Sequence, residues 1–178
     1  HLSLIEQSRE KSDLTICSIF INPRQFNNSN DLQQYPVTLE EDIRLLEQSG
    51  CDLLFIPSPE EIYPPDYQVK TYPLGQLEQV LEGEHRPGHF QGVCAVVERL
   101  LHIIPCDTLF LGEKDFQQCL VIKKLLEIMD EKIELNICPT LRETDGLAMS
   151  SRNLRLNPKQ RVIAAALYKA LHQNQGLL

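Results

Sequence analysis

The segment Gly112–Gln118 combines residue types that can bind a phosphate group. It follows an apolar run and precedes a helical pattern, and a helix N-terminus presents free N–H groups and a positive dipole end to an anion. Gly112 would let the backbone come close to a ligand, and Lys114 adds a full positive charge. Lys114 and Gln118 are four residues apart and could share one helix face. The alternative interpretation is a simple helix cap at Asp115 with solvated charges.

A second cluster, Met149–Arg152, offers two hydroxyl groups and a guanidinium in consecutive positions. Arg152 presents a planar fork of N–H donors that suits phosphate oxygens. Ser150 and Ser151 add hydroxyl donors and acceptors directly before it. The alternative is a serine-rich turn that caps the next short helix.

Two further segments offer polar groups for a small acid. In Asn22–Phe26, the amides of Asn22 and Gln25 could donate and accept hydrogen bonds, and the alternative is an ordinary turn. Arg86 and His89 flank a Pro-Gly turn and bring two cationic or potentially cationic groups, which could face an anionic ligand. The alternative for this second segment is a surface loop.

The elements that must position these residues follow from the hydrophobic pattern. Strands are predicted at Leu14–Ile21, Asp52–Ile56, Asp107–Leu111 and Lys132–Cys138. Helices are predicted at Leu2–Ser12, at Thr38–Ser49, around Val93–Ile104, around Val121–Ile128 and from Asn157 onward. Strands that alternate with helices predict an α/β fold with a mainly parallel sheet, in which ligands bind beyond the carboxyl ends of the strands. Three of the four polar clusters follow predicted strands, so we expect them to meet at one edge of the sheet.

Three details refine this prediction. Lys132–Cys138 alternates apolar and polar residues, which is typical of a half-exposed strand at a sheet edge. Thr38 and Glu41 have the spacing of a capping box at the start of a helix. Asn157 is a predicted N-cap that places Pro158 at the first helical position.

Composition excludes several classes of protein. The chain has 178 residues, 42% of them hydrophobic, and a net charge of −8, which argues against a general nucleic-acid binder. No apolar run approaches the roughly 18 residues that span a bilayer, so we expect no membrane association and a cytoplasmic protein. The six cysteines form no CxxC pair and are predicted to be buried thiols. Neither a GxxxxGK[ST] loop nor GxGxxG is present.

Taken together, the polar segments closely resemble those of the pantothenate synthetase family. The matching segments, in chain order, are HLSLI (His1–Ile5), SIFINPRQF (Ser18–Phe26), YPVTLEED (Tyr35–Asp42), RPGHFQGV (Arg86–Val93), LGEKDFQQ (Leu111–Gln118) and PTLRETDGLAMSSRN (Pro139–Asn153). They occur in the family's order and are spread over nearly the whole chain. GEKD followed by glutamine, and then DGLAMSSR, is a specific combination.

The resemblance implies a Rossmann-like nucleotide-binding domain of the HIGH-motif nucleotidyltransferase superfamily, which also includes class I aminoacyl-tRNA synthetases. Residues 1–178 would form this single N-terminal catalytic domain. The family's first strand, with the start of its His-x-Gly-His motif, and its small C-terminal domain that closes over the site would both lie outside the chain. The implied activity is ATP-dependent ligation of pantoate to β-alanine through a pantoyl-adenylate, with Mg²⁺ and in a homodimer.

The same resemblance assigns roles to individual residues. It implies catalytic roles for His1, the second histidine of the His-x-Gly-His motif and its proton donor, and for Lys114 and Arg152. It implies ATP binding by His1, Gly112, Glu113, Lys114, Asp115, Leu141, Met149, Ser150, Ser151 and Arg152. It implies binding of pantoate or β-alanine by Gln25 and Gln118, and we add Asn22, Arg86 and His89 as further candidates. No protein ligand is assigned to the metal.

Two other functions fit the same features. One is another nucleotidyltransferase of this superfamily with a different acceptor, which would be distinguished by the roles of Gln25 and Gln118 and by dependence on pantoate. The other is a nucleotide-binding module without catalytic activity, which would bind ATP and form no product.

Overall fold

The computed structural model describes residues 1–25 and 38–174 of the 178-residue chain. Phe26 and positions 35–37 of the sequence match at Tyr35–Asp42 therefore lie outside the described residues. The chain divides into two compact units, His1–Cys138 and Pro139–Leu178, and each is considered separately below. The prediction of a single domain stays a prediction.

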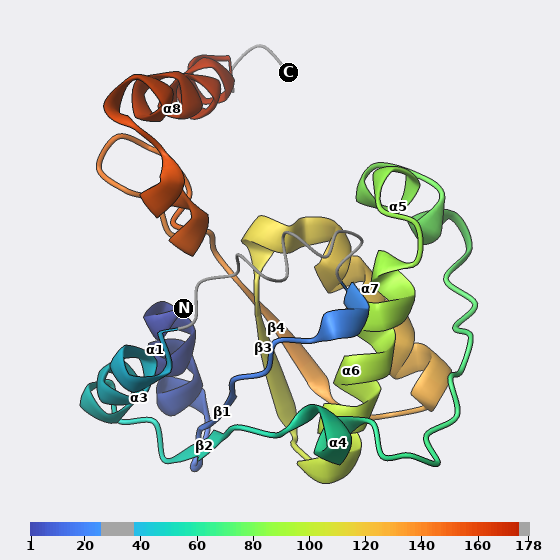
Figure 1. Ribbon diagram of the computed structural model, residues 1–178. Coiled ribbons are helices and arrows are strands. Elements are labelled where there is room, and N and C mark those ends of the chain that lie inside the picture. Colours follow the sequence, from blue (N-terminus) through green and yellow to red (C-terminus); the bar gives the residue numbers. More distant parts are fainter. Residues whose placement is uncertain (26–37, 175–178) are drawn as a thin grey trace. The chain divides into compact units, whose positions relative to one another are not determined.

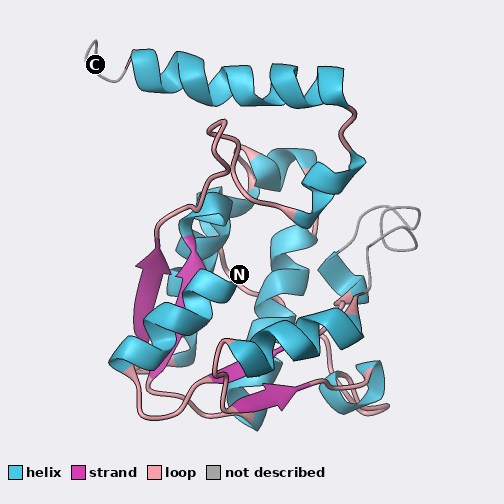
Figure 2. Cartoon of the chain, turned by 90° about the vertical axis from the view of Figure 1, so that its left-hand side faces the viewer, coloured by secondary structure: helices cyan, strands magenta, loops and turns pink. Residues whose placement is uncertain are grey.

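Unit 1 contains two pairs of parallel strands. β1 (Ile16–Ser18) pairs with β2 (Leu53–Phe55), and β3 (Thr108–Gly112) pairs with β4 (Glu134–Cys138). Figure 2 shows the two pairs in magenta, and no ladder joins them in the described residues. β1, β2 and β4 are shorter than the predicted strands, whereas β3 has the predicted length and begins one residue later. The predicted α/β fold with parallel strands and flanking helices is confirmed.

Helices flank both strand pairs (Figure 1). Their bounds are α1 Leu2–Lys11, α3 Leu39–Gln48, α4 Pro59–Ile62, α5 Glu82–His85, α6 His89–Ile103 and α7 Phe116–Met129, with short 3₁₀ helices η1 Pro23–Gln25, η2 Gly75–Glu78 and η3 Glu113–Asp115. Two side chains in the C-terminal half of α1 make hydrogen bonds to residues outside the helix. The Ser8 hydroxyl lies 3.0 Å from that of Thr15, and Lys11 Nζ lies 2.6 Å from Asn136 Oδ1.

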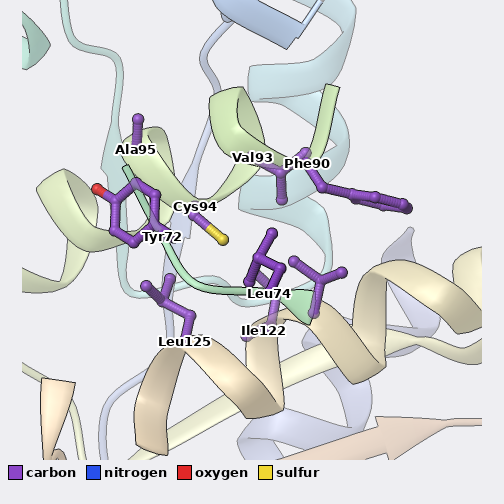
Figure 3. Close-up of a cluster of buried hydrophobic side chains, with 9 residues drawn as sticks. Tyr72, Leu74, Phe90, Val93, Cys94, Ala95, Ile122 and Leu125 are labelled. Atoms are coloured by element: carbon purple, nitrogen blue, oxygen red, sulfur yellow. The ribbon is translucent and has the colours of Figure 1, made fainter. Parts of the chain in front are cut away.

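The hydrophobic core of unit 1 lies between α6 and α7 (Figure 3). Its buried members are Tyr72, Leu74, Phe90, Val93, Cys94, Ala95, Val121, Ile122 and Leu125. Leu109, Leu111 and Leu135 of β3 and β4 pack against this cluster. Val93 and Val97 of one predicted helical pattern and Val121 and Leu125 of the other meet in this cluster, because apolar positions three and four apart share one helix face, whereas Ile128 is exposed.

The six cysteines remain free thiols. Cys94, Cys119 and Cys138 are buried as expected, whereas Cys17, Cys51 and Cys106 are only half-buried. Burial raises the pKa of the Cys94 thiol to about 12, so this thiol stays protonated at neutral pH. Within the described residues, no helix has the length and apolar character needed to cross a membrane.

Helix starts agree with the sequence at Asn157 but not at Thr38. Asn157 Oδ1 accepts the Gln160 N–H at 3.0 Å, and the Gln160 side chain accepts the Asn157 N–H, which completes a capping box. The capping box predicted at Thr38 is wrong, because Thr38 makes no side-chain cap and its hydroxyl instead donates to Asp42 Oδ2 at 3.2 Å. Its ψ of 43° departs from the extended backbone that Asn157 has at its cap.

Unit 2 consists of a loop, the 3₁₀ helix η4 (Ser151–Arg155) and α8 (Pro158–Gln173). A bidentate ion pair joins the loop to α8. Arg161 Nε lies 2.7 Å from Asp145 Oδ2, and Arg161 Nη2 lies 3.1 Å from Asp145 Oδ1. The Arg142 guanidinium also lies 4.0 Å from the centre of the Tyr168 ring.

The buried carboxylate of Glu98, on α6, binds the segment that contains Lys70 and Tyr72. Glu98 is only 6% exposed, and its two oxygens accept hydrogen bonds from Lys70 Nζ at 2.6 Å and from the Tyr72 hydroxyl. Burial alone would raise the pKa of the Glu98 carboxyl, but these hydrogen bonds outweigh it and hold the pKa below its ordinary value of 4.5.

We predict that Glu98→Gln lowers the free energy of unfolding by about 2 kcal/mol at pH 7, because a charge-assisted buried hydrogen bond is lost. A carboxyl whose pKa is lowered by folding stabilises the protein above its unfolded-state pKa, and this contribution disappears as the pH falls through the folded-state value. The difference between variant and native protein should therefore shrink towards pH 3. Urea unfolding at both pH values measures it, with the exposed Glu10→Gln as control. An equal difference at both pH values would contradict the role of the charge.

Candidate functional site

The predicted phosphate-binding segment begins where β3 ends. Gly112 closes the strand, η3 follows at Glu113–Asp115, and α7 begins at Phe116. Gly112 has an extended backbone with φ −81° and ψ 129°, and a Cβ atom there would meet no protein atom within 4 Å. Neither the backbone nor internal packing therefore requires glycine at this position. The space that a side chain would fill is open to a ligand.

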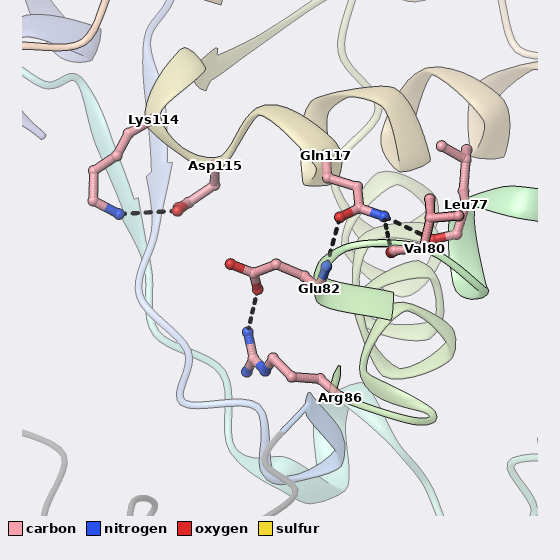
Figure 4. A network of polar contacts seen from close by, with 7 residues as sticks. All are labelled: Leu77, Val80, Glu82, Arg86, Lys114, Asp115 and Gln117. Carbon is pink, nitrogen blue, oxygen red and sulfur yellow. Dashed lines mark hydrogen bonds and ion pairs between the residues drawn. The ribbon is translucent and has the colours of Figure 1, made fainter. Parts of the chain in front are cut away.

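Lys114 is an exposed cation at this turn (Figure 4). Its side chain is 42% exposed, and its Nζ lies 2.9 Å from Asp115 Oδ1. Asp115 is the N-cap residue of α7 and is exposed, as the alternative interpretation has it, although its side chain makes no cap hydrogen bond. An exposed ion pair contributes at most about 1 kcal/mol, so Lys114 can exchange Asp115 for a phosphate at small cost.

The two adjacent glutamines of α7 differ in their surroundings. Gln117 is buried, and its amide makes three hydrogen bonds, to Leu77 O, Val80 O and Glu82 N. Gln118 is half-buried, and its amide has no hydrogen-bond partner in the described residues. Binding of pantoate by Gln118 stays a prediction. The contacts of Gln117 were not predicted, although its spacing of four residues from the buried Val121 places it on the buried face.

Asn22 anchors the turn that carries Gln25. It is buried, its Nδ2 donates to Gly92 O at 3.0 Å, and its Oδ1 accepts hydrogen bonds from the Tyr63 hydroxyl at 2.9 Å and from Arg24 N at 3.2 Å. These bonds hold η1, whose last residue is Gln25, against the first turns of α6. Asn22 thus has a clear supporting role, and direct contact of Asn22 with substrate stays a prediction.

Arg86 and His89 lie on either side of the turn that starts α6. Arg86 Nη1 lies 3.0 Å from Glu82 Oε2, and Arg86 O accepts the His89 N–H at 3.0 Å. Gly88 has φ +77°, a left-handed conformation that glycine adopts without strain. His89 is buried with its ring 5.0 Å from that of Phe90, so the alternative of a wholly exposed surface loop is wrong for this residue.

Hydrogen bonds connect these segments of unit 1 near the starts of α6 and α7. Asn22 connects η1 to α6 through Gly92, and Gln117 connects α7 to the segment that leads into α5 and Arg86. The segments of Asn22, Arg86, His89 and Lys114 therefore form one continuous group of contacts. His1 precedes α1 with its carbonyl accepting Leu4 N–H at 2.9 Å, and within the described residues no hydrogen bond or ion pair connects it to this group.

The second predicted cluster lies in unit 2. Leu141 O accepts the Met149 N–H at 2.9 Å, which holds the two predicted ATP-binding segments of this unit beside each other. Ser150 Oγ accepts the Arg152 N–H at 3.2 Å and caps η4, as the alternative interpretation proposed for this serine. Ser151 and Arg152 are exposed. Whether this cluster meets the Gly112–Gln118 segment stays a prediction.

A cavity in unit 2 is distinct from both predicted clusters. It has a volume of about 350 Å³ and lies between the loop at 142–146 and α8. None of the predicted site residues lines it, and both acidic and basic side chains border it. The cavity therefore adds no candidate to the site.

Comparison with known proteins decides the family. A family model described as pantoate-beta-alanine ligase matches residues 1–176. The chain belongs to the pantoate–β-alanine ligase family. Similar members include the pantothenate synthetase of Cytophaga hutchinsonii, 47% identical over 96% of this chain and 60% of that protein, and that of Porphyromonas gingivalis, 44% identical over 99% of this chain and 63% of that protein.

Solved structures of this ligase family have the same fold. The pantothenate synthetase of Thermus thermophilus superposes with a TM-score of 0.94 at 42% identity, covering 99% of this chain and 65% of that one. The pantoate-beta-alanine ligase of Francisella tularensis, complexed with beta-gamma ATP and beta-alanine, superposes with a TM-score of 0.91 at 42% identity, covering 97% and 66%. The chain spans about three fifths of the length of the curated relatives that it matches.

We predict that Gly146→Ala destabilises the loop that carries Met149–Arg152. Gly146 has φ +92°, and a Cβ there would lie 2.2 Å from Tyr168 Cδ1. The combined strain and overlap should lower the free energy of unfolding by about 3 kcal/mol. Gly75→Ala is the matched control, because Gly75 has φ +61° with no atom within 4 Å of its Cβ position, and should cost about 1 kcal/mol. Urea unfolding measures both, and equal losses would show that the Tyr168 contact is unimportant.

Proposed function

We propose that this chain is the nucleotide-binding part of a ligase that joins pantoate to β-alanine at the expense of ATP. The observation that carries the proposal is the turn after β3, where Gly112 faces open space and Lys114 is exposed at the start of α7. A ligand phosphate fits these features because a helix N-terminus and an ammonium group both favour an anion. The family match over residues 1–176 and the relative from Francisella tularensis complexed with beta-gamma ATP and beta-alanine support the same conclusion.

In the first proposed step, a pantoate carboxylate oxygen attacks the α-phosphorus of ATP. A pantoyl-adenylate forms and pyrophosphate leaves, so negative charge builds on the phosphate oxygens. Preplaced donors stabilise that charge more than they stabilise the ground state. Lys114 Nζ, the Arg152 guanidinium, the hydroxyls of Ser150 and Ser151, and the His1 imidazole are the donors that we assign to it.

In the second proposed step, the β-alanine amine attacks the acyl carbon of the adenylate. An amide bond forms, the acyl–phosphate bond breaks, and AMP leaves. Gln25 and Gln118 would hold pantoate by its hydroxyl and carboxylate groups, and Arg86 and His89 would face a substrate carboxylate. This is catalysis by positioning, and it requires no covalent bond to the protein.

Mg²⁺ belongs to the proposal as the counter-ion of the triphosphate. We expect phosphate oxygens and water to be its main ligands, because Mg²⁺ keeps several waters and seldom sits in a cage made only of protein groups. In the part of the chain that the structure describes, no group of three or more His, Cys, Asp or Glu side chains is placed to hold a metal. A homodimer in the cytoplasm completes the proposal.

Formation of AMP tests this function. The full-length protein is incubated with ATP and Mg²⁺, and pantoate and β-alanine are added singly and together. We expect efficient release of AMP only when both acids are present, because the amine must discharge the adenylate. Absence of AMP from a folded protein that still binds ATP would support a nucleotide-binding module without catalysis, and AMP release with a different acceptor would support another nucleotidyltransferase.

Substitutions of Lys114 and Gln118 should change different kinetic constants. Lys114→Ala should lower kcat for adenylate formation by about 100-fold and change the KM for pantoate little, because the ammonium acts on charge that develops in the transition state. Gln118→Ala should raise the KM for pantoate by about tenfold with a smaller change in kcat. Steady-state kinetics at saturating ATP separate the two. Equal losses of kcat and pantoate affinity in both variants would contradict these assignments.

A further inference from the structure

Leu81 has a backbone conformation that normally belongs to glycine. Its φ is +52° and its ψ is −124°, and its side chain is 69% exposed. A non-glycine residue in such a region is strained and persists only when its surroundings hold it there. Leu81 gains little from burial in return, so the restraint must act on the backbone.

The Gln117 side chain supplies that restraint from both sides of Leu81 (Figure 4). Gln117 Nε2 donates to Val80 O at 2.9 Å, and Gln117 Oε1 accepts the Glu82 N–H at 3.0 Å. The second N–H of the amide donates to Leu77 O at 2.9 Å. Gln117 is only 9% exposed, so these bonds are shielded from competing water.

Close packing restricts the same segment a second time. A Cβ on Gly83 would lie 2.6 Å from Leu77 O and 2.6 Å from the carbonyl carbon of Glu78. Both are backbone atoms, which cannot move aside as a flexible side chain can. The segment from Leu77 to Gly83 therefore folds tightly on itself and has one well-defined path into α5.

That path ends at Arg86. The last residue that Gln117 holds is Glu82, and Glu82 Oε2 in turn accepts a hydrogen bond from Arg86 Nη1 at 3.0 Å. Gln117 itself stands three residues after Lys114 on the adjoining turn. The Gln117 amide thus joins the first turn of α7, which follows Lys114, to the segment that carries Arg86.

We propose that Gln117 is a positioning residue, which clamps the strained backbone around Leu81 and so fixes Arg86, through Glu82, to receive a carboxylate of a small acid substrate. Gln117 acts through Arg86 and touches no reacting atom. The identity of the acid rests on the proposed function, whereas the clamp itself does not. The two parts can therefore be tested separately.

Amide hydrogen exchange tests the clamp without any activity. Gln117→Leu removes all three hydrogen bonds and should speed the exchange of residues 79–86, with Glu82 N–H foremost, by about tenfold or more. Gln91→Leu is a matched control, because Gln91 also makes three hydrogen bonds, to Tyr72 N, Tyr72 O and Glu78 Oε1. That control should loosen residues 72–78 instead. Unchanged exchange at 79–86 in Gln117→Leu, or the same pattern in both variants, would overturn the proposal.

A double-mutant cycle tests the action through Arg86. The KM values for pantoate and β-alanine are measured for Gln117→Leu, Arg86→Ala and the double variant of the full-length protein. Gln117→Leu alone should raise the KM for the acid that Arg86→Ala affects by about tenfold, and should add less than about twofold in the Arg86→Ala background. Gln91→Leu should leave this KM within about twofold.

If the two substitutions raise KM independently, so that their effects multiply in the double variant, the action through Arg86 is overturned. A general loss of stability caused by Gln117→Leu would raise KM equally with and without Arg86. If the native protein forms no AMP with both acids, the proposed function fails, and the exchange experiment alone decides whether Gln117 is a clamp.

Discussion

The packing of α6 against α7 is the interaction on which the described part of the site depends. Cys94 on one helix and Ile122 and Leu125 on the other are almost completely buried in this contact. Both helices begin in segments that we assign to binding, α6 at His89 and α7 just after Lys114. The apolar contact between the helices thus sets the distance between His89 and Lys114, which lie at the starts of the two helices. A fully buried core resists small shifts, because a displaced side chain loses many close contacts at once.

Side-chain amides of α6 and α7 extend that rigidity into the segments between β2 and α6. Gln91 and Gln117 each bond to backbone groups of a segment that is distant in sequence, and so replace the pairing that a strand would give it, whereas Asn22 bonds to Gly92 O of α6. Each amide offers donors and an acceptor together, so it can serve a peptide N–H and a carbonyl of the same loop. An apolar side chain of similar size would leave those peptide groups unpaired in the interior.

The sequence predicts the elements well because the signals for them are local. The spacing of apolar residues predicts α6 and α7, the apolar runs predict parallel strands, and Asn157-Pro158 predicts the start of α8. Residue types and places after strands predict the binding segments, and resemblance predicts the roles of single residues in them. The structure adds that Gly112 faces open space. The role of Gln117 could not be predicted, because its partners lie 35 to 40 residues away. The capping box predicted at Thr38 does not form, because the backbone of Thr38 lacks the extended conformation that the motif needs.

The free cysteines give this protein a built-in set of chemical probes. Cys17, Cys51 and Cys106 are half-buried, whereas Cys94 on α6 and Cys119 on α7 are shut inside. A thiol reacts with an alkylating reagent only as an accessible thiolate, and burial raises the pKa of the inner thiols as well as blocking access to them. Modification of Cys94 therefore requires α6 and α7 to separate. The rate at which that thiol is labelled reports how often the helix pair opens, without any engineered label.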